Sequence, residues 1–203
     1  MNTIDNHIIN KIKKAKGGSL FFMDDFLNLG SAKAVNKALE RLVDKDEISR
    51  VARGIYARLK THPVFGKIYP TAEDIAKAIA KRDKARILPT GVLALNALGL
   101  STQIPLNIVY LTDGSARIVK VENRTIKFKK TSPKNLATIG SISTLVIQAL
   151  KEIGKDKATE KEIEIILKHL QKEEPYRLEH DIKMAPEWIR IIMRKALKEK
   201  KDA

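Results

Sequence analysis

Three arginines, Arg50, Arg53 and Arg58, stand within the twelve residues ISRVARGIYARL, and no acidic residue accompanies them. A guanidinium group binds phosphate in a planar, bidentate geometry, so a cluster of arginines suits an anionic ligand. The apolar residues between them indicate strand, turn and strand, with Gly54 in the turn and Arg53 at its tip. The stretch is therefore either the solvated edge of an ordinary sheet or a hairpin that holds an anion.

A second basic cluster precedes this hairpin, on a helix predicted to begin after Ser31 and to end near Val43. Ser31 is a good N-cap, and acidic residues are favoured in the first turn because the backbone N–H groups carry partial positive charge there. The first turn instead holds Lys33, and no acid occurs before Glu40. A bound phosphate would make this lysine favourable, whereas a solvated lysine without a role is the alternative.

The polar face of this helix and the hairpin together predict a DNA-binding surface. We expect Lys33, Asn36 and Lys37 to enter or flank the major groove, with Asn36 as the best candidate for reading a base edge. Arg41 and the hairpin arginines would bind phosphates or reach a neighbouring minor groove. The predicted DNA-binding residues are Ser31, Lys33, Asn36, Lys37, Arg41, Arg50, Arg53 and Arg58.

These residues need a scaffold, and the order of predicted elements supplies one. Apolar periodicity predicts a helix over about 4–15, then the strand SLFF, a short helix over 24–29, the helix described above and the two-stranded hairpin. Helix, strand, helix, helix and hairpin is the order of a winged helix-turn-helix. The Pro- and Gly-containing connection THPVFGKIYP then places the domain boundary, with a winged helix-turn-helix over 1–62 and a second domain over 63–203.

The second domain is predicted to hold a small antiparallel sheet and several helices, which makes the fold class α+β. TAEDIAKAIAKRD and LPTGVLALNALGL read as helices, with capping boxes at Thr71–Asp74 and Thr159–Glu162. Three strands follow in NIVYLTDGSARIVKVENRTIKFKKTS, with turns at Asp113-Gly114 and Glu122-Asn123. The remaining predicted helices cover about 141–153, 159–173, 176–183 and 187–199.

The segment ALNALGLSTQIP gathers amides and hydroxyls around a predicted helix end that Gly99 stops. Its polar residues are Asn96, Ser101, Thr102 and Gln103. They are either capping groups that satisfy the last helical carbonyls or a recognition loop, and both interpretations stay open.

The charge distribution favours an anionic partner. The 203 residues carry a formal net charge of +15. Residues 1–60 hold 12 basic and 7 acidic residues, 61–140 hold 13 and 5, and 141–203 hold 14 and 12. A basic excess in the first two thirds suggests nucleic acid, an anionic membrane surface or an acidic protein, although a solubility charge is the plain alternative.

Enzymatic and metal chemistry find little support. The common nucleotide-binding, hydrolase and zinc-protease motifs are missing, so we expect no catalytic residues, no metal and no cofactor. Asp24 and Asp25 are adjacent and read as helix-start acids, because neighbours on a helix point about 100° apart. The four histidines lack metal-ligand spacing, His180-Asp181 is expected to be solvated, and Trp188 is expected in the core.

Four stretches together resemble the AbiEi-type antitoxins of bacterial type IV toxin–antitoxin, or abortive-infection, systems. They are RVARGIYARL, YPTAEDIAKAIAKR, ILPTGVLALNALGLSTQIP and YLTDGSARIVKVENRTIKFKK, and the resemblance covers roughly residues 5–153. The resemblance implies an N-terminal winged-helix domain that represses its own operon. It also implies a C-terminal domain that counters a nucleotidyltransferase-like toxin without a stable complex, and it brings no catalytic residues.

We therefore expect a DNA-binding antitoxin and transcriptional repressor whose partners are double-stranded DNA of its own promoter and such a toxin. Two alternatives are a protein-interaction module for an acidic partner and a stand-alone winged-helix regulator without antitoxin activity. The polar residues after Met1 disfavour a signal peptide, and no apolar run approaches the roughly 20 residues of a membrane span. With no cysteine in the chain, we expect a cytoplasmic protein that makes no membrane contact; the oligomeric state stays open.

Overall fold

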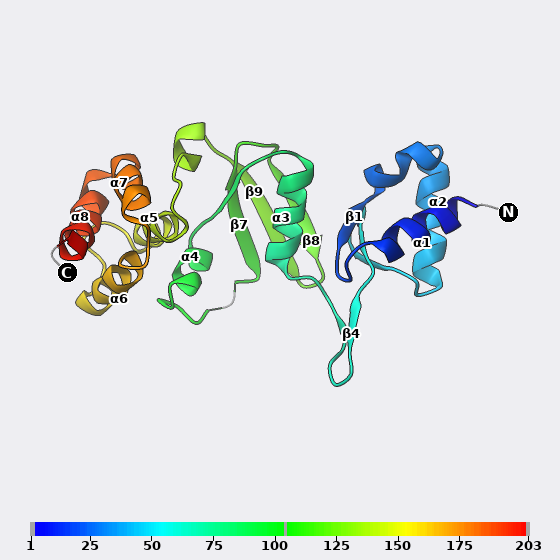
Figure 1. The fold of residues 1–203 in the computed structure, drawn as a ribbon, viewed down its shortest axis with the longest axis horizontal. Coiled ribbons are helices and arrows are strands. Elements are labelled where there is room, and N and C mark those ends of the chain that lie inside the picture. The colour runs from blue at the N-terminus through cyan, green and yellow to red at the C-terminus, as the bar shows by residue number, and fades with distance from the viewer. Residues whose placement is uncertain (1–2, 104, 202–203) are drawn as a thin grey trace. The chain divides into compact units, whose positions relative to one another are not determined.

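The structure, a computed structural model, describes residues 3–103 and 105–201 and has the expected α+β class (Figure 1). The chain forms two compact units. The first comprises Met1–Arg82 with Val119–Thr125, and the second comprises Asp83–Ile118 with Ile126–Ala203.

The first unit begins with the predicted sequence of elements. They are α1 (Ile4–Lys14), β1 (Leu20–Phe22), η1 (Met23–Leu29), α2 (Ala32–Asp44), β2 (Ser49–Ala52) and β3 (Ile55–Ala57). The second helix, η1, is a 3₁₀ helix, since only seven residues separate β1 from the extended Gly30. The Asp25 carboxylate accepts the Phe22 N–H at 2.8 Å, so Asp25 is a helix-start acid as predicted.

The predicted apolar faces of α1 and α2 form the core of this part. Ile8 and Ile12 of α1 meet Val35 and Leu39 of α2 around the fully buried Phe26. Their spacing of three and four positions places these side chains on one face of each helix. Burial of this apolar stripe fixes which face of α2 is left for solvent.

The hairpin is part of a three-stranded antiparallel sheet with the order β1-β3-β2. The pairing of β2 with β3 shifts register between Arg50 and Ala52, which is the mark of a β-bulge. The bulge buries Val51 and Ala52 in succession and explains why the sequence alternates imperfectly here. Arg53 and Gly54 form the two-residue turn, as predicted, and Gly54 has φ +72°.

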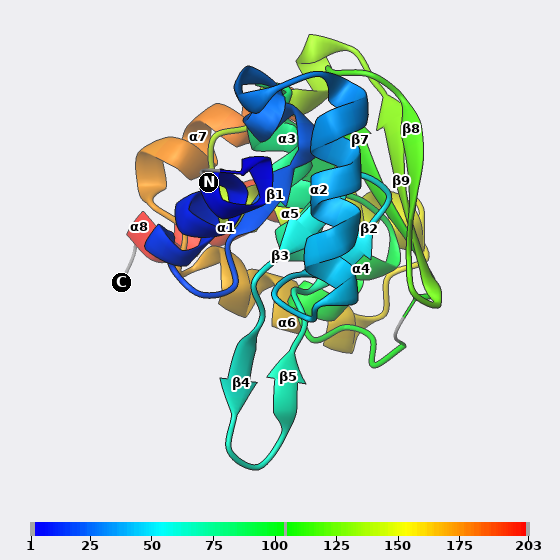
Figure 2. The same cartoon turned by 90° about the vertical axis from the view of Figure 1, so that its right-hand side faces the viewer.

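The segment predicted as a connection is instead a second hairpin of β4 (Lys60–His62) and β5 (Gly66–Ile68). It projects from the sheet of its own unit (Figure 2), with Val64 and Phe65 each 79% exposed at its tip. Lys67 pairs with Asp46 at the base. Proline and glycine mark a turn as readily as a linker, so composition could not separate the two.

The first unit continues through α3 (Ala72–Arg82) before the chain enters the second unit. The predicted boundary after residue 62 therefore does not coincide with the division between units, which falls after Arg82. The Arg82 guanidinium lies 4.4 Å from the centre of the Phe22 ring, which links the end of α3 to β1. The capping box at Thr71 is confirmed: its hydroxyl accepts the Asp74 N–H, and Asp74 accepts the Thr71 N–H.

A four-stranded sheet with the order β6-β7-β9-β8 follows, and most of its residues belong to the second unit. Its strands are β6 (Ile87–Pro89), β7 (Asn107–Thr112), β8 (Arg117–Val121) and β9 (Arg124–Lys130). The predicted helix over LPTGVLALNALGL is wrong in its first part, which forms β6, and only α4 (Val92–Ala97) is helical. Proline at the edge strand and Gly91 at φ +57° stop the helix from starting earlier.

The predicted turns of this sheet have different outcomes. Glu122-Asn123 joins β8 to its neighbour β9, as expected for a hairpin. Asp113-Gly114 leads from β7 to β8, but β9 lies between these strands, so no tight hairpin forms there. Asp113 instead accepts the Arg86 backbone N–H at 2.7 Å and its Nε at 2.8 Å, which ties the start of β6 to the end of β7.

The last third is helical, and its boundaries fall within a few residues of the prediction. Its elements are η2 (Pro133–Leu136), α5 (Ser141–Ile153), α6 (Glu160–Leu170), α7 (Pro175–Met184) and α8 (Glu187–Lys201). Leu150, Ile166, Leu178 and Ile189 are among the fully buried side chains of its core. No helix among the described residues combines the length and apolar character that a membrane span requires.

Candidate nucleic-acid interface

The solvent face of α2 carries two lysines without a partner. Ser31 caps the helix, and its hydroxyl accepts the Ala34 N–H at 3.3 Å. Lys33 and Lys37 lie one turn apart and exposed, and neither side chain makes a hydrogen bond or ion pair with any described residue. The first turn holds no acid. The positive end of α2 and both ammonium groups are therefore available to an anion.

Arg41 is engaged within the fold. Its Nε and Nη2 donate to Asp5 Oδ2 and Oδ1 of α1 at 2.9 and 2.6 Å. The hydrogen bond from Arg41 holds the pKa of Asp5 below its ordinary value. Because Asp5 already satisfies this guanidinium, Arg41 is a weaker candidate for a DNA phosphate than the unpaired lysines of the same helix.

Asn36, the predicted base-reading residue, is also occupied. Its Nδ2 donates to Glu40 Oε1 at 2.7 Å, one turn along α2. Both groups lie at the surface, so the bond exchanges readily with water or a ligand, and Asn36 keeps its place beside the lysines. Reading a base would require this bond to open.

Two of the hairpin arginines, Arg50 and Arg53, line a concavity of about 450 Å³ in the first unit. Arg50 comes from β2 and Arg53 from the turn, while Arg82 reaches it from α3. The other lining residues are Met23, Asp24, Asn36, Gly54 and Tyr56. The side chains of Arg50 and Arg53 make no hydrogen bond or ion pair elsewhere in the described chain.

Tyr56 is the buried tyrosine among the residues that line this concavity. The residue is only 2% exposed, and burial raises the pKa of its hydroxyl, with Glu40 adding to the shift and Arg50 opposing it. The hydroxyl therefore stays protonated near neutral pH, where it can donate a hydrogen bond.

The predicted DNA-binding residues thus divide into three groups. Asn36, Arg50 and Arg53 share the concavity, and Lys33 and Lys37 share the exposed face of α2. Arg58 follows β3 at the end opposite the turn, and Arg41 faces α1. Sequence reasoning missed Arg82 and Tyr56, because Arg82 ends an ordinary amphipathic helix and Tyr56 reads as a core strand residue.

The polar loop after α4 satisfies much of its own hydrogen bonding. Asn96 Nδ2 donates to the Gln103 carbonyl, and the Gln103 N–H donates to Ser101 Oγ at 3.1 Å. Gly99 ends the helix at φ +69°, as predicted. Asn96 Oδ1 is buried and has no partner, whereas Thr102 is exposed. These bonds tie the loop together locally and do not involve the carbonyls of the last helical turn, so capping and recognition both stay predictions for these residues.

Two buried carboxylates, Asp181 and Glu173, lie at the start of α5, and Asp181 belongs to the His180-Asp181 pair that was predicted to be solvated. Asp181 is fully buried and accepts the Ile139 and Gly140 N–H groups at 2.9 and 2.8 Å. Glu173 accepts the Ile142 N–H at 2.7 Å. The prediction for Asp181 was wrong because a charged residue on a helix can turn inward to cap a neighbouring helix.

This acidic cluster is structural in character. Ser143 Oγ and His180 both contact Asp181, so the carboxylate lies between them and no serine–histidine bond forms. Among residues 3–103 and 105–201, no three histidine, cysteine or acidic side chains are grouped to hold a metal ion.

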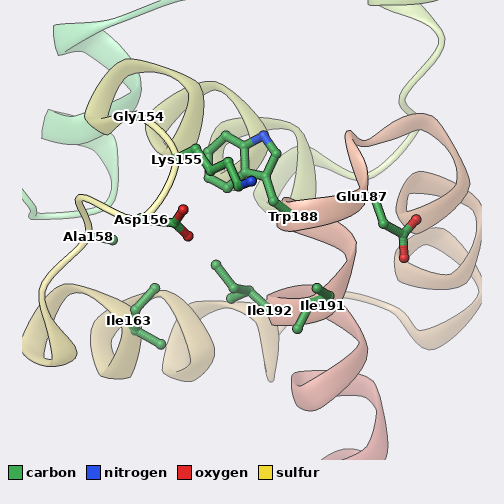
Figure 3. A pocket seen from close by; sticks show the side chains of 9 residues that line it. All are labelled: Gly154, Lys155, Asp156, Ala158, Ile163, Glu187, Trp188, Ile191 and Ile192. Atoms are coloured by element: carbon green, nitrogen blue, oxygen red, sulfur yellow. The ribbon is translucent and has the colours of Figure 1, made fainter.

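A second concavity, of about 500 Å³, lies among the C-terminal helices (Figure 3). Trp188, Ile191 and Ile192 of α8 line it together with Ile163 of α6. Trp188 is partly buried against the helical core, as predicted, and its ring also borders this concavity. Lys155, Asp156 and Glu187 also line it, so the lining mixes charged and apolar side chains, and Glu187 is bonded to Arg190 and Arg194.

Comparison with known proteins places the chain in a family. No curated protein matches it significantly. Residues 7–178, which include the interface and most of the second unit, match a family of unknown function, DUF6088. The chain therefore belongs to the DUF6088 family.

Proposed function

We propose that the first unit is a winged helix-turn-helix that binds double-stranded DNA, and that the chain represses its own promoter. The observation that carries this proposal is a set of unpaired cations on adjoining elements: the side chains of Lys33, Lys37, Arg50 and Arg53 have no hydrogen-bonding partner among the described residues. Arg41, Lys67 and Lys13 of the same unit are each paired with an acid. Unpaired positive side chains gathered on one unit provide the electrostatic attraction to DNA phosphates.

The local sequence supports the same proposal. Residues 48–72 contain five basic residues and no acidic residue. The hairpin and the segment that leads from it to α3 therefore carry no carboxylate. A DNA phosphate backbone is attracted both by the lysines and by the positive end of α2.

The test is binding of upstream DNA and of a scrambled duplex across a range of salt concentrations. Lys37→Ala and Arg53→Ala should each weaken binding and each lower the salt slope by about one. Arg194→Ala, an exposed α8 arginine, removes the same charge outside the interface and should leave binding unchanged. Equal affinity for both duplexes would exclude a specific repressor, and an unchanged salt slope in both interface variants would exclude this surface.

For the second unit we propose antitoxin activity against a nucleotidyltransferase-like toxin. This part is supported by the resemblance of residues 5–153 to AbiEi-type antitoxins, with ALNALGLSTQIP and the TDG segment as its most specific stretches. In a host whose growth is stopped by such a toxin from the neighbouring gene, co-expression of this chain should restore growth. Failure of the second unit to restore growth would leave a stand-alone regulator.

A protein-interaction role is the second candidate, and the β4–β5 hairpin favours it. Its tip exposes Val64 and Phe65, and its base adds Lys60. The hairpin continues from the end of β3 opposite the Arg53 turn, so its tip lies away from the proposed DNA surface. Copurification with the product of the adjacent gene that is lost in Phe65→Ser, without retention of DNA, would favour this candidate.

A further inference from the structure

The concavity beside the hairpin turn combines groups that phosphate recognition uses. Arg50, Arg53 and Arg82 come from three different elements and line the same space of about 450 Å³. The buried Tyr56 adds a hydroxyl, and Asn36 adds an amide. Guanidinium groups bind phosphate oxygens bidentately, and hydroxyl and amide donors complete such sites.

The position of Arg82 indicates a built site rather than a chance meeting of surface arginines. Its guanidinium lies 4.4 Å from the centre of the Phe22 ring, and Phe22 is 5% exposed in β1. Stacking on an aromatic ring orients the plane of the guanidinium and lowers the entropy lost when it binds an anion. α3 thereby supplies a cation to a site otherwise made by the hairpin and α2.

The hairpin turn at this site leaves open space beside it. A Cβ added at Gly54 would meet no heavy atom within 4 Å, so the space beside the turn is free. Asp24 of η1 is the one acid in the lining; it is exposed and has no hydrogen-bonding partner among the residues described. Three arginines against one carboxylate leave the lining with a formal charge of +2.

We propose that this concavity binds a phosphate group through Arg50, Arg53 and Arg82, and that Asp24 opposes the anion. The inference rests on the proposed DNA-binding function where the phosphate belongs to the DNA backbone. A free phosphate or phosphorylated small molecule would use the same chemistry, and the volume suits either source.

The experiment has two arms that share one set of variants: Arg82→Ala, Arg82→Lys, Asp24→Asn, Lys37→Ala and the control Arg194→Ala. The first arm measures the affinity for upstream DNA by fluorescence anisotropy at several salt concentrations. The second arm measures the shift in Tm caused by inorganic phosphate against chloride at equal ionic strength.

In the DNA arm we expect Arg82→Ala to weaken binding about tenfold, as the loss of a charge-assisted contact does. Arg82→Lys should recover only part of this loss, because an ammonium group lacks the bidentate geometry. Asp24→Asn should bind more tightly than the unaltered chain. Such a gain in affinity cannot result from misfolding, because a variant that folds poorly does not bind DNA more tightly.

The outcomes distinguish DNA phosphate from free phosphate as the ligand, and they distinguish failure of this site from failure of the proposed DNA-binding function. DNA binding that depends on Arg82 and Asp24 supports the site with DNA as its source, and a phosphate-induced Tm shift that Arg82→Ala abolishes supports a free phosphate. No dependence on Arg82 or Asp24 in either arm overturns the inference. If Lys37→Ala still weakens DNA binding in that case, the proposed function stands without this site, and if it does not, both fail.

Discussion

At the scale of single residues, the cations of the first unit differ in whether a carboxylate already satisfies them. Arg41 and Lys37 lie on the same helix, four positions apart. The Arg41 side chain binds Asp5, whereas the Lys37 side chain has no partner among the described residues. A paired guanidinium must give up its carboxylate before it can bind phosphate. Pairing therefore decides which basic residues remain candidates for DNA contact.

The Arg41–Asp5 pair gives the first prediction, on stability and pH. The hydrogen bond from Arg41 lowers the pKa of Asp5 below 3.8, so the carboxylate binds protons less readily in the folded chain. The contribution of the pair is therefore present above the ordinary pKa and is lost as pH falls through the folded value. Arg41→Ala should therefore lower the Tm more at neutral pH than at a pH well below 3.8, as thermal melts would show.

An equal loss of Tm at both pH values would assign the role of Arg41 to packing of its alkyl chain instead. The same variant tests the DNA surface. Because Arg41 is already neutralised by Asp5, Arg41→Ala should weaken DNA binding less than Lys37→Ala does. A larger loss in Arg41→Ala would show that DNA displaces Asp5.

At the scale of elements, periodicity located most helices because each buries one face. The stripes of α1 and α2 and the capping box of α6 all appear where the sequence predicts them. The errors fall where short signals are ambiguous, as in β6 and the β4–β5 hairpin. A three-residue strand carries too few side chains for its period to be read.

The start of α5 gives the second prediction. Asp181 accepts two backbone N–H groups and a bond from Ser143 while fully buried, and Gly140 leaves no room for a Cβ beside Ser143 and Glu173. Asp181→Asn would place an amide N–H₂ against these donors, so we expect a loss of about 2–3 kcal/mol in the free energy of unfolding. Urea denaturation measures it.

The control for this change is Glu160→Gln, which alters an exposed acid of α6 and should shift the free energy of unfolding by less than about 0.5 kcal/mol. Equal effects of the two variants would mean that Asp181 does not hold the start of α5. Sequence alone placed Asp181 in solvent, because its partners lie about forty positions away along the chain.

At the scale of the whole molecule, each unit has its own buried core. One surrounds Phe26 in the first unit, and the other surrounds Leu150 in the helical part of the second. Separate cores allow one unit to lose stability while the other stays folded. The proposed DNA-binding and antitoxin tasks would then be separable by mutation.

Leu150→Ala gives the third prediction. The side chain is fully buried in the helical core, so its truncation should cost about 2–5 kcal/mol. Hydrogen exchange should quicken in α5, α6 and α8 and stay unchanged in α1 and α2, with DNA affinity unaltered. Phe26→Ala is the reciprocal variant. Loss of protection in both units from either change would show that they unfold together.

Much of the candidate site could be predicted because it rests on local signals: Ser31 as a cap, Lys33 in a first turn without acid, and Arg53 in a turn with Gly54. Sequence determined these features through spacing and backbone preference, which act within a few residues. Tertiary structure alone decided that Arg41 meets Asp5 and that Arg82 joins Arg50 and Arg53. Those contacts join elements far apart in the chain, and only packing of the folded elements brings such residues together.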